Sequence, residues 1–374
     1  MPTRRQLVRI DAQRLADAQA QMRTTGIDAM FVGPSADLRY LTGYHALPLE
    51  RLTLLIVPAD GDVSLVVPDL EAPRAEQSGA PSFAELVTWG ETDDPFDRVM
   101  DRLRAAGTAS DGTYAVQDRL WSAFTLRLQE RLPGAGWVPG ASVMRPLRIV
   151  KGPDEVAALR EVGAAIDHVH ALVPQLLRAG RTEREVGHDI AELILGSHDE
   201  VNFVIVASGS NGASPHHETG DRPLEAGDAV VVDIGGRLDG YCSDETRNYA
   251  IGHVPDGYAE LHAALEQAQD AAVEATRPGV TAESIDAAAR DLLDDRGYGH
   301  LFVHRTGHGI GVEEHEDPYI VGGNSEPVAP GMAFSIEPGI YDRGRYGARI
   351  EDIVVVTDEG VERLNHRPRG LQVV

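Results

Sequence analysis

Residues 229–252 read AVVVDIGGRLDGYCSDETRNYAIG, and this stretch is the starting point for the fold. The apolar run AVVV ends at Asp233, and Asp244 follows eleven positions later. The intervening GGRLDGY has the glycine and aspartate content of a turn, which predicts a β-hairpin. Pairing about Leu238 and Asp239 would set the two carboxylates opposite each other. Directly opposed carboxylates repel, so this register requires a cation, whereas a slipped register would leave an ordinary polar hairpin.

A second stretch, SIEPGIYDRGRYGARIED at 335–352, repeats the arrangement. A hairpin centred on Gly344 places Glu337 opposite Glu351, on strands whose other residues are mostly apolar. Buried carboxylates need a metal ion, an arginine or hydrogen-bond donors. Four acids from two hairpins therefore predict a site for two divalent metal ions, which would leave a shared water able to ionise.

Histidines are concentrated in HRTGHGIGVEEHEDP, residues 304–318, which contains His304, His308 and His315. One imidazole added to four carboxylates gives an oxygen-rich ligand set, which favours Mn²⁺, with Co²⁺, Fe²⁺ or Zn²⁺ as alternatives. If the stretch is extended, the alternate glycines from Gly307 to Gly311 share one face. A face without side chains allows another backbone to approach closely.

The chain is expected to divide near residue 150. Residues 1–150 alternate short apolar runs, such as AMFVG and LTLLIVP, with helical stretches, which predicts a small α/β domain. The sequence KGPDE at 151–155 interrupts this pattern and predicts the start of a long helix, with proline and acidic residues in its first turn. Two rounds of helices followed by strands then predict an α+β domain over 151–374.

These motifs resemble the pita-bread metallopeptidases, the family of methionine aminopeptidase, aminopeptidase P and prolidase. The resemblance rests on DIGG and GYCSDETR, HRTGHGIG and HEDP, SIEPGIY and RIED, and it covers roughly residues 150–374. Near the N-terminus, SADLRYLTGY is similar to the D-x-x-Y-x-T-G signature of the creatinase/prolidase N-terminal domain, which is typical of the proline-specific branch. The resemblance implies a creatinase-like domain over 1–150 and a pita-bread catalytic domain over 151–374.

The resemblance also implies a role for each of the five candidate ligands. Asp233 would bind one metal ion, and Asp244 would bridge both. His308 and Glu337 would bind the second ion, and Glu351 would bridge. Creatinase and the non-enzymatic binding relatives lack such a complete set, so the filled positions favour a peptidase over these two alternatives.

Three histidines and an arginine match positions that border the active site of this family. His216 would lie beside the substrate, and His315 would meet the scissile carbonyl. His304 stands four residues before the expected ligand His308, where it is either a site residue or a packed side chain. Arg349 is expected to organise the neighbouring carboxylates.

The implied reaction is hydrolysis of an Xaa-Pro peptide bond, with Glu337 moving the proton of the attacking water to the leaving nitrogen. A dipeptidase (prolidase) is favoured, and an aminopeptidase P acting on longer peptides is the alternative. A dipeptidase must bind a free carboxylate, which arginine does best. Some prolidases carry an arginine after H-E-x-P, but this chain has Tyr319 there and no arginine over 316–342. Besides Tyr319, Arg51 and Asp37 of the N-terminal domain are therefore candidates for binding the substrate.

Composition limits the partners and the compartment. The 374 residues carry a net charge of −25, which argues against nucleic-acid binding because that requires a basic surface. The single cysteine excludes an intramolecular disulfide and suits a cytoplasmic protein. Neither a signal peptide nor an apolar run long enough to span a membrane is recognised. The expected partners are a small peptide substrate and, from the resemblance alone, a second copy in a homodimer.

Overall fold

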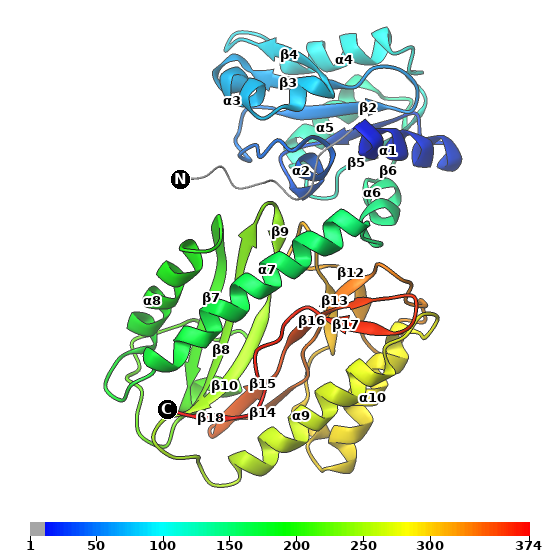
Figure 1. Cartoon of the computed structure of the whole chain (residues 1–374). Coiled ribbons are helices and arrows are strands. Elements are labelled where there is room, and N and C mark those ends of the chain that lie inside the picture. Colours follow the sequence, from blue (N-terminus) through cyan, green and yellow to red (C-terminus); the bar gives the residue numbers. More distant parts are fainter. Residues whose placement is uncertain (1–11) are drawn as a thin grey trace. The chain divides into compact units, whose positions relative to one another are not determined.

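The computed structural model describes residues 12–374, so residues 1–11 of the expected N-terminal domain lie outside the described part. The chain forms two compact units, one ending at Arg148 and the other spanning Ile149–Val374 (Figure 1). Each unit has its own hydrophobic core. No helix within residues 12–374 combines the length and the apolar character needed to cross a membrane.

The N-terminal unit is an α/β domain, as predicted, built on a six-stranded sheet of order β4-β3-β2-β1-β5-β6. The strands are β1 (Ala29–Val32), β2 (Leu54–Pro58), β3 (Ser64–Pro68), β4 (Glu85–Trp89), β5 (Thr113–Val116) and β6 (Gly136–Pro139). The helices are α1 (Ala12–Thr25), α2 (Ala36–Thr42), α3 (Ala72–Gln77), α4 (Pro95–Ala105), α5 (Ser122–Arg131) and α6 (Ala141–Arg148). The amphipathic helices α4 and α5 bury Phe96, Val99 and Leu128 in one cluster with Phe31 and Tyr114 of the sheet. Apolar burial of this kind is what holds such a layered domain together.

The C-terminal unit contains two rounds of a helix pair followed by a sheet, which confirms the α+β prediction (Figure 1). The first round comprises α7 (Pro153–Leu172), α8 (Glu183–Leu195), β7 (Glu200–Ser208), β8 (Ala229–Leu238), β9 (Tyr241–Cys242) and β10 (Glu245–Ala250). The second comprises α9 (Tyr258–Ala275), α10 (Ala282–Asp295), β11 (Gly307–Gly309), β12 (Glu316–Ile320), β13 (Ala333–Ile336), β14 (Gly339–Asp342), β15 (Tyr346–Arg349), β16 (Asp352–Val356), β17 (Val361–Arg363) and β18 (Gln372–Val373).

The strands of this unit form two five-stranded sheets and a two-stranded ribbon. The first sheet has the order β18-β10-β8-β7, with β9 paired to β8, and the second has the order β12-β11-β13-β16-β17. Strands β14 and β15 form the ribbon. One core cluster joins α7 and α8 to the first sheet, and another joins α9 and α10 to the second. Each helix pair therefore covers its own sheet.

The predicted register of the first hairpin is wrong by two residues. Asp233 lies opposite Thr246 instead of Asp244, and Leu238 pairs with Tyr241. The turn is the dipeptide Asp239–Gly240, in which both residues have positive φ angles of 49° and 89°. Asp-Gly supplies the left-handed conformations that a two-residue turn requires, and this preference moves the centre of the hairpin one position along. Side chains along a strand point alternately to the two faces of the sheet. Asp244 is two residues from Thr246, the partner of Asp233, so it still points to the same face as Asp233 and lies diagonal to it.

The predicted register of the second hairpin is confirmed. Ribbon pairs such as Gly339 with Arg349, and the pairing of Ile336 with Asp352 below them, are all symmetric about Gly344. The register on both sides of Glu337 and Glu351 therefore sets these two acids opposite each other.

The close backbone approach predicted for the alternate glycines is also confirmed. A Cβ atom on Gly307 would lie 1.8 Å from the Ser335 carbonyl oxygen, and one on Gly309 would lie 2.2 Å from the Asp317 carbonyl oxygen.

Candidate active site

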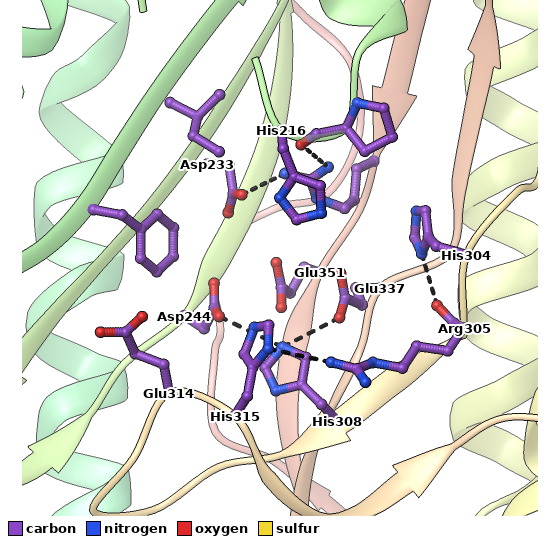
Figure 2. Close-up of a pocket in the computed structure, with 14 residues that line it drawn as sticks. His216, Asp233, Asp244, His304, Arg305, His308, Glu314, His315, Glu337 and Glu351 are labelled. Carbon is purple, nitrogen blue, oxygen red and sulfur yellow. Dashed lines mark hydrogen bonds and ion pairs between the residues drawn. The ribbon is translucent and has the colours of Figure 1, made fainter. Parts of the chain in front are cut away.

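A pocket of about 530 Å³ in the C-terminal unit collects most of the residues that the sequence singled out (Figure 2). Both sheets and the ribbon contribute to its walls. Nine predicted site residues line it: His216, Asp233, Asp244, His304, His308, His315, Glu337, Arg349 and Glu351. Five further residues line it that the sequence did not identify: Phe203, Ile205, Pro215, Arg305 and Glu314.

Three buried side chains at the base of the pocket can hold a metal ion together. Asp244, His308 and Glu351 each offer one ligand atom, and these atoms lie within 4.8 Å of one another. The Nε2 atom of His308 lies 3.2 Å from Glu337 Oε1 and 3.8 Å from Asp244 Oδ2. Glu337 therefore adjoins the same group, and Figure 2 shows the four side chains converging.

The hydrogen bonding of this cluster fits a bound cation. Asp244 Oδ1 and Glu351 Oε1 are buried, and neither has a hydrogen-bond partner among the described residues. Burial raises the pKa of Asp244 well above its usual range, and the charges of Glu351 and Asp233 raise it further. Burial likewise raises the pKa of Glu351, together with the charges of Glu337 and Asp233. Carboxylates that are buried, crowded and without donors are costly unless a cation neutralises them, so the donor set matches a divalent metal ion.

Asp233 is held by a network that reaches across to the second hairpin. Arg349 donates through Nη2 to Asp233 Oδ2, through Nε to Thr246 Oγ1 at 3.1 Å, and through Nη1 to the Tyr341 hydroxyl at 2.9 Å. The Thr246 hydroxyl lies 2.7 Å from Asp233 Oδ1 and 2.8 Å from Glu351 Oε2. Thr246 and Arg349 thus join a carboxylate of the first sheet to one of the second hairpin.

His304 and His315 have hydrogen-bond partners that determine their tautomers. His304 Nδ1 lies 2.7 Å from the Arg305 carbonyl oxygen and therefore donates, which leaves Nε2 to accept from the Tyr341 hydroxyl at 2.9 Å. His315 Nδ1 accepts from Arg305 Nη2 at 3.2 Å. Burial lowers the pKa of His315 to about 4, aided by the neighbouring His308 and Arg305. The neutral His315 ring consequently carries its hydrogen on Nε2, where it can donate to a ligand.

The family of the chain follows from comparison with known proteins. Residues 157–358 match metallopeptidase family M24, and residues 14–150 match the creatinase/prolidase N-terminal domain. The chain belongs to metallopeptidase family M24. The chain is therefore a metal-dependent peptidase, and the pita-bread fold expected from the resemblance is confirmed.

Similar proteins match the M24 chain over nearly its whole length. The crystal structure of dipeptidase PepE from Mycobacterium ulcerans has a TM-score of 0.91 and 50% sequence identity, covering 98% of each chain. The structure of recombinant prolidase from Thermococcus sibiricus has a TM-score of 0.93 and 33% identity, covering 98% of this chain and 100% of that one. The Xaa-Pro dipeptidase of Lactobacillus helveticus is 34% identical over 95% of this chain and 97% of its own length.

His216 lies in the pocket of the M24 unit, on a loop that two anchors hold in place. The buried carboxylate of Glu183 accepts hydrogen bonds from Ser208, from Asn211 at 3.0 Å and from His217 Nε2 at 2.8 Å. Arg349 donates to the carbonyl oxygen of Pro215, the residue before His216. Neither Glu183 nor His217 stood out in the sequence, because their importance depends on how the loop folds back on α8.

The predicted substrate-binding residues other than Arg349 do not line this pocket. In the N-terminal unit, Asp37 pairs with Arg148 at 2.7 Å, and Arg51 pairs with Glu91 at 2.8 Å and with Glu50 at 2.5 Å. Tyr319, on β12, packs its ring 4.3 Å below the guanidinium group of Arg305, which does line the pocket.

Proposed function

We propose that this M24 metallopeptidase is an Xaa-Pro dipeptidase. The observation that carries the proposal is the convergence of Asp233, Asp244, His308, Glu337 and Glu351 in one pocket of an M24 fold. The creatinase/prolidase N-terminal domain and the relatives named dipeptidase PepE, prolidase and Xaa-Pro dipeptidase support the choice of substrate. We further propose a homodimer in the cytoplasm, on the family resemblance and the single cysteine.

The cofactor in this proposal is a pair of divalent cations, most simply Mn²⁺, held by these five side chains. Asp233 would bind one ion, His308 and Glu337 the other, and Asp244 and Glu351 both. Carboxylate oxygens with a single imidazole favour Mn²⁺, Co²⁺ or Fe²⁺, and Zn²⁺ also accepts such ligands. When bound, divalent ions supply Lewis acidity and lower the pKa of a shared water toward neutrality.

Glu337 is the proposed proton shuttle. Burial by itself would raise the pKa of Glu337, but its hydrogen bond to His308 and nearby positive charge, including that of Arg349, lower it to about 2. The ionised carboxylate can accept the proton of the attacking water. It then returns that proton to the nitrogen of the departing proline, which must be protonated as the peptide bond breaks.

The histidines complete the proposed substrate site. The Nε2–H group of His315 points to a role as donor to the scissile carbonyl oxygen, where negative charge develops during attack. His216 would contact the substrate near the leaving nitrogen. The side chains of Phe203, Ile205 and Pro215 give one wall of the pocket an apolar surface, which suits a residue without a hydrogen-bonding side chain. Proline fits such a wall because its side chain is an apolar ring, and its nitrogen carries no N–H group that would need an acceptor.

A comparison of three peptides tests the proposal. Protein loaded with Mn²⁺ is incubated with Ala-Pro, Ala-Pro-Ala and Ala-Ala, and release of free alanine is measured. We expect the highest kcat/KM for Ala-Pro. Preferential cleavage of Ala-Pro-Ala would identify an aminopeptidase P instead, and equal cleavage of Ala-Ala would remove the specificity for proline.

A further inference from the structure

One arginine of the pocket has no carboxylate partner among residues 12–374. The guanidinium group of Arg305 donates to His315 Nδ1 at 3.2 Å, and its central carbon lies 4.3 Å above the ring of Tyr319. Figure 2 shows this guanidinium group beside His315 and its hydrogen bond to that ring. A planar guanidinium group carries five N–H donors, so these contacts leave most of its donors for a ligand.

The other arginine of the pocket cannot serve in this way. Arg349 is buried, and its three nitrogen atoms donate to Asp233, Thr246, Tyr341 and Pro215. His315 accepts the hydrogen bond of Arg305 through Nδ1. Arg305 is therefore the cation among the described lining residues that remains available to an anion.

The backbone on both sides of Arg305 is firmly held. Its carbonyl oxygen accepts from His304 Nδ1 at 2.7 Å. The next residue, Thr306, donates through its backbone nitrogen and its hydroxyl to the buried Asp286, at 3.1 and 2.7 Å. Stacking on Tyr319 adds a cation–π contact that orients the guanidinium plane. An arginine held in this way loses little further freedom when it binds a carboxylate.

Arg305 also lies near the cluster that is proposed to hold metal. It contacts His315, whose ring centroid lies 3.9 Å from that of His308. In an Xaa-Pro dipeptide the carboxylate is separated from the scissile nitrogen by only two bonds of about 1.5 Å each. A carboxylate bound by Arg305 would thus keep the scissile bond close to His315 and His308.

We propose that Arg305, supported by Tyr319, binds the free carboxylate of the proline residue in the substrate and thereby selects dipeptides. This inference rests on the proposed Xaa-Pro dipeptidase function. It also gives Tyr319 a purpose. Some prolidases carry an arginine at the position of Tyr319, whereas here the ring supports an arginine that lies in the segment just before β11, the strand paired with β12.

The test compares Ala-Pro with alanyl-prolinamide, which lacks the carboxylate but keeps the scissile bond. Arg305→Met removes the charge, and Arg305→Lys keeps the charge without the planar fork. The matched control is Arg345→Met, because Arg345 also stacks on a tyrosine, Tyr346, at 4.7 Å but lies on the exposed turn of the ribbon. If the amide is cleaved slowly, its inhibition constant against Ala-Pro replaces its KM.

Arg305→Met is expected to raise KM for Ala-Pro about 10- to 100-fold, the loss typical of a charge-assisted hydrogen bond. Binding of the amide should change less than about threefold, and Arg305→Lys should recover part of the loss. Equal losses on both substrates would show that Arg305 only positions His315, and an unchanged KM for Ala-Pro would also overturn the inference. Failure of the wild-type protein with Mn²⁺ to cleave any Xaa-Pro compound would instead reject the proposed function, so the two failures are distinguishable.

Discussion

Thr246→Val is the most informative single perturbation of the side-chain cluster that is proposed to hold metal. Thr246 is fully buried, and its hydroxyl contacts Asp233 Oδ1 at 2.7 Å, Glu351 Oε2 at 2.8 Å and Arg349 Nε at 3.1 Å. Valine preserves the shape of threonine and its β propensity but removes the hydroxyl. The substitution therefore deletes the group that joins two proposed metal ligands while leaving the strand pairing in place.

The expected loss of metal affinity follows from these contacts. A hydroxyl carries one hydrogen, so it donates to only one of the two carboxylates at a time. A hydrogen bond to a charged group contributes about 1.5–3 kcal/mol, and about 1.4 kcal/mol changes an equilibrium constant tenfold. Thr246→Val should therefore weaken Mn²⁺ binding about 10- to 100-fold, which is the range typical of residues that orient metal ligands.

Isothermal titration of Mn²⁺ into chelator-treated protein measures this loss. Thr246→Ser keeps the hydroxyl and should retain most of the affinity. Thr276→Val is the matched control, because the Thr276 hydroxyl is also buried but donates to the Ala272 carbonyl oxygen in α9 at 2.9 Å. That control should bind Mn²⁺ like the wild-type protein. If Thr246→Val binds Mn²⁺ within about twofold of the wild-type protein, the hydroxyl does not orient these carboxylates and the reasoning is refuted.

Three further predictions concern the proton shuttle, the substrate loop and the metal-free state. Glu337→Gln should lower kcat for Ala-Pro about 10²- to 10⁴-fold, and normal turnover at full metal content would exclude Glu337 as the shuttle. Glu183→Gln should lower the free energy of unfolding by about 1–3 kcal/mol, and it should raise KM for Ala-Pro because it loosens the loop that carries His216. Denaturant unfolding and steady-state kinetics measure these two effects, and an unchanged KM would contradict the anchoring role. The raised pKa values of Asp244 and Glu351 mean that the folded metal-free protein holds protons that the unfolded chain releases at about pH 4. The contribution of these two protonated carboxyl groups to the stability of the metal-free protein should therefore decline as the pH rises above about 4, and Asp244→Asn should remove part of that decline. Thermal melts of both metal-free proteins over a pH series measure the difference, and identical profiles would contradict those shifts.

The carboxylates of the site were predictable because they interrupt apolar strands. Asp233 follows four apolar residues, and Glu351 precedes the buried strand β16, so each acid stands where the pattern calls for a hydrophobic residue. The second hairpin also has a symmetric pattern about Gly344, whose positive φ of 82° suits a turn. The edge strands β4 and β6 escaped prediction, because their residues are largely half-exposed and carry little apolar periodicity.

The register of the first hairpin and the supporting residues could not be predicted as well. Centring the turn on Leu238 and Asp239 ignored the stronger preference of Asp-Gly for positive φ angles. Thr246 and Arg305 look ordinary in the sequence, since threonine is common in strands and arginine on surfaces. Their significance depends on which side chains the fold places beside them, and that information lies in contacts between residues far apart in the chain.

The most direct test of the account is the recovery of activity when Mn²⁺ is returned to chelator-treated protein. Hydrolysis of Ala-Pro is measured while bound Mn²⁺ is counted by elemental analysis, with Asp244→Asn in parallel. We predict no turnover without metal, activity that rises with bound Mn²⁺ to two ions per chain, and little activity or binding in Asp244→Asn. Full Ala-Pro hydrolysis by metal-free protein, or metal-loaded protein that leaves Ala-Pro intact, would contradict the central claim that this cluster is the metal centre of an Xaa-Pro dipeptidase.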